Sequence, residues 1–112
     1  MTDALFDAEK LTVLVVDDHD PMRKGIRRVL STMGFENIVE KFDGDGAEET
    51  LQLVPVDLVI TDIFMQKKNG FDLLRYIRSR TYGSEIPVIV VTGDATKEDI
   101  IKAHDLGAND YL

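Results

Sequence analysis

Acidic and hydroxyl side chains follow three apolar stretches of the sequence and define the chemistry open to it. Each stretch is rich in β-branched residues, which is typical of a strand buried on both faces. The residues that follow them are Asp17 and Asp18, Asp62, and Thr92 with Gly93. Parallel neighbouring strands bring their carboxyl ends to one edge of a sheet, where open α/β sheets bind ligands. We therefore expect these side chains to meet at one site.

Three carboxylates at one sheet edge repel one another, and a hard divalent cation relieves that repulsion. Carboxylates combined with water and a backbone carbonyl suit Mg²⁺. A carboxylate such as Asp62 can also attack phosphorus and form an aspartyl-phosphate. The metal then neutralises charge on the transferring phosphoryl group, and the Thr92 hydroxyl and Gly93 amide are placed to donate hydrogen bonds to its oxygens. The pattern permits a Mg²⁺-assisted phosphoryl-transfer site.

The elements that must position these residues alternate between strand and helix. Apolar runs predict strands at residues 11–16, 37–41, 58–60, 87–91 and from 110 to the last residue, 112. The second run is the least apolar, which favours an edge strand. Alternation with short connections predicts a parallel sheet with helices on both faces and right-handed crossovers. We predict an α/β fold with a doubly wound, flavodoxin-like five-stranded sheet in the order 2-1-3-4-5, with the fifth helix missing.

Capping patterns mark where the four helices begin. The first is predicted to start at an Asp20 cap before Pro21, the second at Asp45, the third at Asn69 and the fourth at a Thr96 capping box. Gly34 and Gly107 are predicted to close the first and fourth helices. In the first helix, apolar residues recur at helical spacing: Met22, Ile26, Val29, Leu30 and Met33. Of these, Met22, Ile26 and Met33 are predicted to form a buried stripe.

Composition narrows the classes of function. The chain has 112 residues, 44% of them hydrophobic, which indicates one soluble globular domain. A net charge of −8 disfavours nucleic acid or an anionic membrane as partners. The sequence has no cysteine, no signal-peptide pattern and no apolar run long enough to span a membrane, so we expect a cytoplasmic protein. Residues 1–10 are interpreted as a loose, partly helical leader and residues 11–112 as the domain.

Several motifs occur in the same order and at the same spacing as in the receiver domain of response regulators. They are Val16-Asp17-Asp18, Thr61-Asp62-Ile63-Phe64-Met65, Asn69-Gly70, Val91-Thr92-Gly93 and Gly107-Ala108-Asn109-Asp110-Tyr111-Leu112. The sequence therefore resembles a chemotaxis-regulator-like receiver domain over residues 11–112. The resemblance implies a phosphorylation-controlled switch in a two-component phosphorelay, a regulatory domain rather than an enzyme.

The resemblance also implies a role for each site residue. Asp62 accepts a phosphoryl group from a phosphohistidine on a sensor histidine kinase or a histidine phosphotransfer protein. Mg²⁺ is held by Asp62, by Asp18 directly, by Asp17 mainly through water and by the backbone carbonyl of Phe64. A switch pair completes the site: Thr92 contacts the phosphoryl group, and the orientation of Tyr111 follows Thr92.

Three departures from the family pattern qualify these roles. Gln66 stands where the family usually has proline, and the family usually has an apolar residue near Lys68, so we expect a more mobile and more polar loop after Asp62. Lys67 and Lys68 are interpreted as solvated, with contact to an acidic surface of a kinase as the alternative. Gly93 stands where alanine is common, although the amide donor is kept. The family's lysine after the fifth strand would fall beyond Leu112, and neither Lys97 nor Lys102 matches its position.

These departures leave other functions open. Without the lysine, the chain can be read as a receiver-like interaction domain that is never phosphorylated. A third reading is an aspartate-nucleophile phosphatase of the haloacid dehalogenase type, but Asp17-Asp18-His19 does not supply that family's Asp-x-Asp motif. His19 is interpreted as an exposed turn residue. We expect either a longer protein or a chain that pairs as a homodimer through its incomplete fifth-strand and fifth-helix side.

Overall fold

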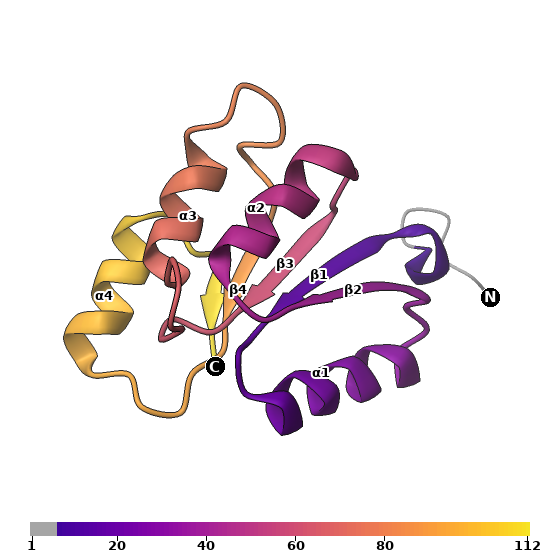
Figure 1. Ribbon diagram of the computed structural model, residues 1–112, viewed down its shortest axis with the longest axis horizontal. Helices are drawn as coiled ribbons and strands as arrows, with labels where there is room; N and C mark the ends of the chain where they lie inside the picture. The colour runs from indigo at the N-terminus through magenta and orange to yellow at the C-terminus, as the bar shows by residue number, and fades with distance from the viewer. Residues whose placement is uncertain (1–6) are drawn as a thin grey trace.

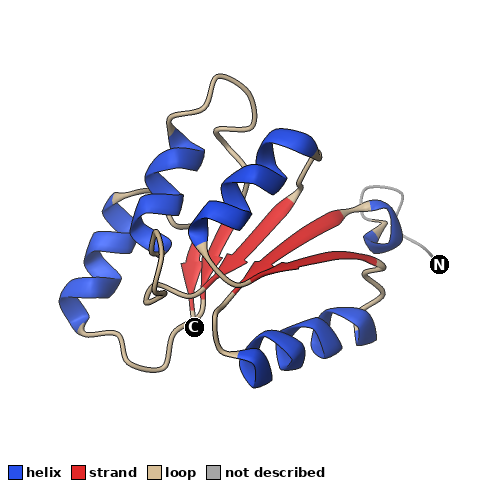
Figure 2. Ribbon diagram, viewed as in Figure 1, coloured by secondary structure: helices blue, strands red, loops and turns tan. Residues whose placement is uncertain are grey.

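The computed structural model describes residues 7–112, and its centre is a five-stranded parallel sheet (Figures 1 and 2). The strand order is β2-β1-β3-β4-β5, as predicted. The strands are β1 (Thr12–Val16), β2 (Asn37–Lys41), β3 (Leu58–Thr61), β4 (Val88–Val90) and β5 (Asp110–Tyr111). The first strand begins one residue later, and the fourth ends one residue earlier, than the apolar runs suggested.

Helices cover the two faces of this sheet unequally. They are α1 (Asp20–Thr32), α2 (Gly44–Leu53), α3 (Gly70–Arg78) and α4 (Lys97–Asp105), and no fifth α-helix occurs in residues 7–112. Figure 1 shows α2, α3 and α4 together on one side of the sheet and α1 alone on the other. Of the expected leader, residues 1–6 lie outside the described part, and Ala8–Lys10 form a short 3₁₀ helix.

Alternating side chains of β1 build the core on both faces. Leu14 and Val16 pack on the side of α2, α3 and α4, whereas Val13 and Val15 pack on the side of α1. All four are fully buried, which is what a central strand of a parallel sheet requires. Each methylene removed from water contributes roughly 0.8 kcal/mol, so this strand is a main source of stability.

The predicted buried stripe of α1 is wrong for Met22 and Met33, which are 42% and 62% exposed. Of the other apolar residues at this spacing, Leu30 is buried and Val29 is 60% exposed. These side chains border an open groove of about 600 Å³ between α1 and the sheet, which also includes Leu112. The spacing of apolar residues identified the correct face of the helix, but residues 7–112 contain no element that packs over this groove.

Two of the predicted helix starts are shifted. The side chain of His19, not Asp20, caps α1 by accepting a hydrogen bond from the Met22 N–H at 3.4 Å. Asp43, not Asp45, caps α2 and accepts from the Gly46 N–H at 2.8 Å. In both places an acceptor earlier in the chain reaches the free N–H groups of the first turn, so the predicted cap becomes part of the helix.

The other helix boundaries agree with the sequence prediction. Asn69 accepts a hydrogen bond from the Asp72 N–H at 3.0 Å, and Thr96 forms the capping box at the start of α4. Gly34 and Gly107 adopt φ angles of +100° and +103°, the left-handed conformation that ends a helix.

Candidate functional site

Three carboxylates converge at the carboxyl ends of β1 and β3. Val16 pairs with Thr61 in the sheet, so the residues that follow them lie side by side. The Asp62 N–H donates to the Val16 carbonyl at 2.9 Å and thereby continues the ladder to the strand ends. One carboxylate oxygen from each of Asp17, Asp18 and Asp62 lies within 4.8 Å of the others. The structure therefore brings the three predicted acids together.

Asp17 is the most enclosed of the three acids, with 2% of its surface exposed. Burial raises the pKa of its carboxyl group because it removes water from the charged form, and the nearby charges of Asp62 and Asp18 raise it further. The backbone N–H of His19 donates to this carboxylate at 2.8 Å and lowers the pKa in the opposite direction. Repulsion among the acids is thus built into the metal-free fold.

Asp62 is half-buried and lies among hydrogen-bond donors. Burial raises the pKa of its carboxyl group, and the charge of Asp18 adds to this effect. The backbone N–H groups of Ile63, at 2.7 Å, and of Phe64, together with the Thr92 side chain, donate to the carboxylate and lower the pKa. These donors hold one carboxylate in a defined orientation at the sheet edge.

A pocket of about 320 Å³ opens at this edge. Its lining contains the predicted Asp17, Asp62, Thr92 and Gly93, and also His19, Met22, Val91 and Asp94. His19 and Asp94 were missed as site residues. The available signal was position, since each follows a strand-end site residue by two places in the sequence.

Tyr111 lies one strand further out than Thr92. It pairs with Val90 across β4 and β5 and packs, partly buried, against the core on the α2, α3 and α4 side. The Thr92 N–H donates to the Leu112 carbonyl at 3.2 Å, so the two switch candidates are joined through the backbone of β5.

Lys67 and Lys68 in the loop after Asp62 are exposed, as predicted, but the side chain of Lys68 also forms ion pairs that the sequence did not indicate. Its ammonium group lies 2.8 Å from a carboxylate oxygen of Glu48 and 3.5 Å from one of Asp45, both in α2. At the other end of the loop, the Gly70 N–H donates to the Ile63 carbonyl at 2.8 Å. A Cβ atom on Gly70 would lie 2.4 Å from the Asp62 carbonyl oxygen, so the close approach requires glycine.

The donor set fits a hard divalent cation. All side-chain ligands in the cluster are carboxylate oxygens, which Mg²⁺ prefers over nitrogen or sulfur. Two oxygens bound to one Mg²⁺ at about 2.1 Å lie at most about 4.2 Å apart. A cluster that spans up to 4.8 Å accommodates the ion when one carboxylate binds it through water.

The sequence was compared with protein-family models and with known proteins. A family model described as the response regulator receiver domain matches residues 13–112. Chemotaxis protein CheY-3 of Vibrio cholerae is 36% identical over 104 residues, which cover 93% of this chain and 80% of that protein. None of the helices in residues 7–112 has the length and apolar character needed to cross a membrane.

Solved structures share the fold. A response regulator receiver protein from Pseudomonas putida is 33% identical, with a TM-score of 0.83 and coverage of 91% of this chain and 84% of that one. The Mn²⁺-bound form of response regulator Rcp1 is 27% identical, also with a TM-score of 0.83, and the match covers 91% of this chain and 79% of that one.

Proposed function

Because the chain belongs to the response regulator receiver domain family, we propose that Asp62 is its phosphoacceptor and that residues 11–112 form the receiver domain. The observation that carries this proposal is the convergence of Asp17, Asp18 and Asp62 at the ends of neighbouring strands β1 and β3. These strands flank the switch point of the order β2-β1-β3-β4-β5, where doubly wound sheets bind ligands.

Asp62 acts as the nucleophile. One of its carboxylate oxygens forms a bond to phosphorus, and the phosphorus–nitrogen bond of a donor phosphohistidine breaks with its electron pair left on the imidazole. The N–H groups of Ile63 and Phe64 and the Thr92 side chain orient the attacking group by donating to it. Attack requires the ionised carboxylate, and these donors favour that charged form.

Asp17, Asp18, Asp62 and the Phe64 carbonyl are the residues that we propose hold Mg²⁺. When bound, the cation supplies positive charge that offsets the charge of the phosphoryl oxygens. The coordination of Mn²⁺ named for response regulator Rcp1 supports a divalent-metal site in this fold. A bound cation would also stabilise the folded state, because it would offset the repulsion among the three carboxylates.

Thr92 and Gly93 would then contact the phosphoryl oxygens, and Tyr111 would follow the movement of Thr92. Thr92 and Gly93 line the pocket at the acidic site, and Tyr111 lies in the neighbouring strand β5. The Thr92 N–H already donates to the carbonyl of Leu112, the residue that follows β5. Phosphorylation would exchange the present Thr92 bond to Asp62 for a bond to the phosphoryl group. The domain is a regulatory switch that assists its own phosphorylation and dephosphorylation.

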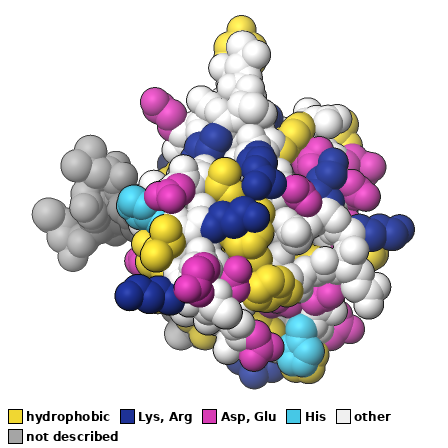
Figure 3. Space-filling model, turned by 90° about the vertical axis from the view of Figure 1, so that its left-hand side faces the viewer, with side chains coloured by type: hydrophobic (Ala, Val, Ile, Leu, Met, Phe, Trp, Pro, Cys, Tyr) yellow, Lys and Arg dark blue, Asp and Glu magenta, His cyan; other side chains and the backbone are white. Residues whose placement is uncertain are grey.

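Receiver domains of this type interact with histidine kinases and phosphotransfer proteins, and we propose such a partner here rather than nucleic acid. The net charge of −8 supports this choice. On the face shown in Figure 3, basic and acidic side chains are interspersed instead of forming a continuous basic surface. The lack of cysteine supports a cytoplasmic location.

A homodimer is proposed as the assembly state of this chain. The groove between α1 and the sheet exposes Met22, Val29, Met33 and Leu112, an apolar patch of the kind that marks interaction sites. Light scattering should give a dimer for the 112-residue chain, and Val29→Lys should shift it toward monomer. A compact monomer at high concentration would contradict the dimer without affecting the phosphoacceptor.

Acetyl phosphate with Mg²⁺, followed by intact-mass measurement, tests the proposed function. One phosphoryl group should be added to the wild type, none to Asp62→Asn, and one to the control Asp105→Asn, which changes an exposed acid in α4. Equal labelling of wild type and Asp62→Asn would refute the assignment. A complete lack of labelling would favour an interaction domain, and continuous turnover of the ester without labelling would favour a phosphatase.

A further inference from the structure

One lysine side chain ties the middle of the loop that joins β3 to α3 to the start of α2. Lys68 bridges Glu48 at 2.8 Å and Asp45 at 3.5 Å, both in the first turns of α2. The hydrogen bond to Glu48 raises the pKa of the Lys68 ammonium group. Because the Glu48 side chain is only 14% exposed, loss of its cation would leave a partly buried carboxylate without an ion-pair partner.

The backbone of the same segment fits closely against α2 (Figure 1). Lys68 adopts a φ angle of +43°, the left-handed conformation that non-glycine residues rarely occupy. The Gly44 N–H donates to the Lys67 carbonyl at 3.2 Å. A Cβ atom on Gly44 would lie 2.1 Å from the Lys68 carbonyl oxygen, so the two backbones touch only because residue 44 is glycine.

The two ends of the loop are fixed by other contacts. At the start, the Ile63 and Phe64 N–H groups donate to Asp62, and at the end Asn69 caps α3 while the Gly70 N–H donates to the Ile63 carbonyl. Between these ends, Met65 packs against the core, and the contacts to α2 made by Lys68 and the Lys67 carbonyl hold residues 67 and 68. The Phe64 carbonyl, proposed to bind the metal, lies at the boundary of that central part.

We propose that Lys68 is a positioning residue for the acidic site: its ion pair with Glu48 and Asp45 holds the loop so that the Phe64 carbonyl is presented to Mg²⁺ beside Asp62. This inference rests on the proposed function of the three acids. It assigns to α2, which contributes no ligand, control over metal affinity. Because the contact is ionic, salt weakens it.

A matched pair of variants separates positioning from simple charge. Lys67 lies next to Lys68, lines a small pocket with Asp18 and forms no ion pair within residues 7–112. Lys67→Gln and Lys68→Gln both remove a positive charge near the acids, and on charge alone both should tighten Mg²⁺ binding. If Lys68 positions the loop, Lys68→Gln should instead weaken Mg²⁺ binding, whereas Lys67→Gln should not.

Calorimetric titration with MgCl₂ and hydrogen exchange of the loop amides measure the two effects. Lys68→Gln should weaken Mg²⁺ binding by roughly two- to fivefold, the size of effect expected from losing an exposed ion pair, and should speed exchange at residues 64–68 without metal. Lys67→Gln should do neither. The exchange variant Lys68→Glu/Glu48→Lys should restore protection and affinity toward wild type.

The outcomes distinguish this inference from the proposed function. Similar Mg²⁺ affinity and similar loop exchange in the two glutamine variants would overturn the role of Lys68 and leave the acidic site intact. A wild-type protein that binds no Mg²⁺ would overturn the metal site and this role together. In that event, loop exchange would still report whether Lys68 holds the loop.

Discussion

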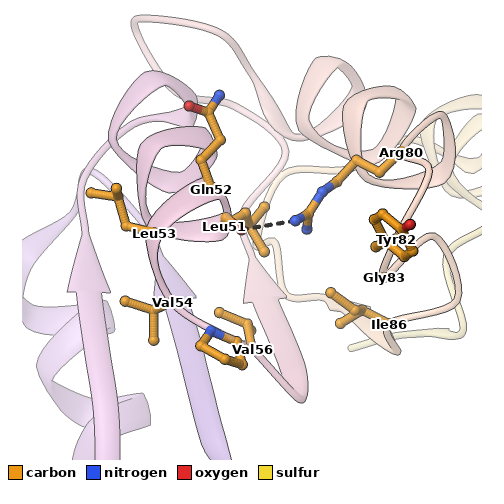
Figure 4. A pocket seen from close by; sticks show the side chains of 10 residues that line it. Leu51, Gln52, Leu53, Val54, Val56, Arg80, Tyr82, Gly83 and Ile86 are labelled. Atoms are coloured by element: carbon orange, nitrogen blue, oxygen red, sulfur yellow. Dashed lines mark hydrogen bonds between the residues drawn. The ribbon is translucent and has the colours of Figure 1, made fainter.

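The two ends of the sheet each carry a pocket, and the pockets differ in chemistry more than in size. At the carboxyl ends, about 320 Å³ are lined by residues that include Asp17, Asp62 and Thr92. At the amino ends, a larger pocket of about 450 Å³ lies between the segment after α2 and the segment after α3 (Figure 4). Its lining includes Leu53, Val54 and Tyr82, and it contains no acidic residue.

The charged side chain that lines the larger pocket, Arg80, already has partners within the protein. The guanidinium of Arg80 donates to the Leu51 carbonyl at 2.8 Å, drawn as the dashed line in Figure 4, and lies 5.8 Å from the centre of the Tyr76 ring. At the carboxyl ends, by contrast, three like charges converge, and burial together with the charge of Asp18 raises the pKa of both Asp17 and Asp62. Convergence of like charges, rather than volume, identifies the functional end of the sheet.

The largest expected effect that separates the two ends is stabilisation by metal. Mg²⁺ at about 100 times its dissociation constant should raise the free energy of unfolding by roughly 2.7 kcal/mol, because it binds only the folded site. Asp18→Ala should lose this gain, whereas Arg80→Gln at the amino ends should keep it. Thermal melts with and without Mg²⁺ measure the difference, and equal gains in all three proteins would remove the distinction between the ends.

A second prediction concerns the close backbone contact beside Asp62. Gly70→Ala places a Cβ atom 2.4 Å from the Asp62 carbonyl oxygen, so the loop must shift at a cost of about 1–3 kcal/mol. Gly25→Ala, in α1, meets no atom within 4 Å and should stabilise its helix by about 0.5–1 kcal/mol. Urea denaturation compares the two variants. A destabilising effect of the same size at both glycines would argue against a specific constraint at the site.

A third prediction follows from the burial of Asp17 and the charges of Asp62 and Asp18 beside it. The folded pKa of Asp17 lies above 3.8, so this group binds more protons in the folded than in the unfolded state between 3.8 and that raised pKa. The contribution of Asp17 to stability without metal should therefore fall as pH rises through this window. Asp17→Asn should melt at a higher temperature than wild type at pH 7, and this advantage should shrink toward pH 4. A variant less stable than wild type at pH 7 would contradict the repulsion.

The smallest effect is expected at the amino ends. Arg80→Gln removes one hydrogen bond to Leu51 and one ring contact with Tyr76, which together contribute about 1 kcal/mol. Phosphorylation by acetyl phosphate should be unchanged in rate and extent. A drop in labelling comparable to that caused by changing a site acid would show that the two ends are coupled.

Sequence patterns predicted the strand order and the meeting of the acids because both follow from local signals. Each apolar run marks a strand, and a residue that directly follows a parallel strand must lie at the carboxyl edge. The family motifs then distinguished Asp62 from Asp17 and Asp18. Neither step depends on knowing how side chains pack.

What sequence could not predict depends on pairing between distant segments. The ion pairs of Lys68 were not predicted because its partners, Glu48 and Asp45, lie in another helix whose approach is set by tertiary packing. The periodicity of α1 identified its apolar face but not whether another element covers it, so Met22 and Met33 were wrongly placed in the core. His19 caps α1 in place of Asp20, whose carboxylate pairs with Arg23.

Chemical trapping of the phosphorylated residue tests the central claim most directly. The wild-type chain would be treated with acetyl phosphate and Mg²⁺, reduced with borohydride to convert an acyl phosphate to homoserine, and mapped by tandem mass spectrometry. We predict homoserine at position 62 and unmodified aspartate at positions 17 and 18. Homoserine at another acid, phosphate on His19 or His104, or no modification despite confirmed Mg²⁺ binding would contradict Asp62 as the phosphoacceptor.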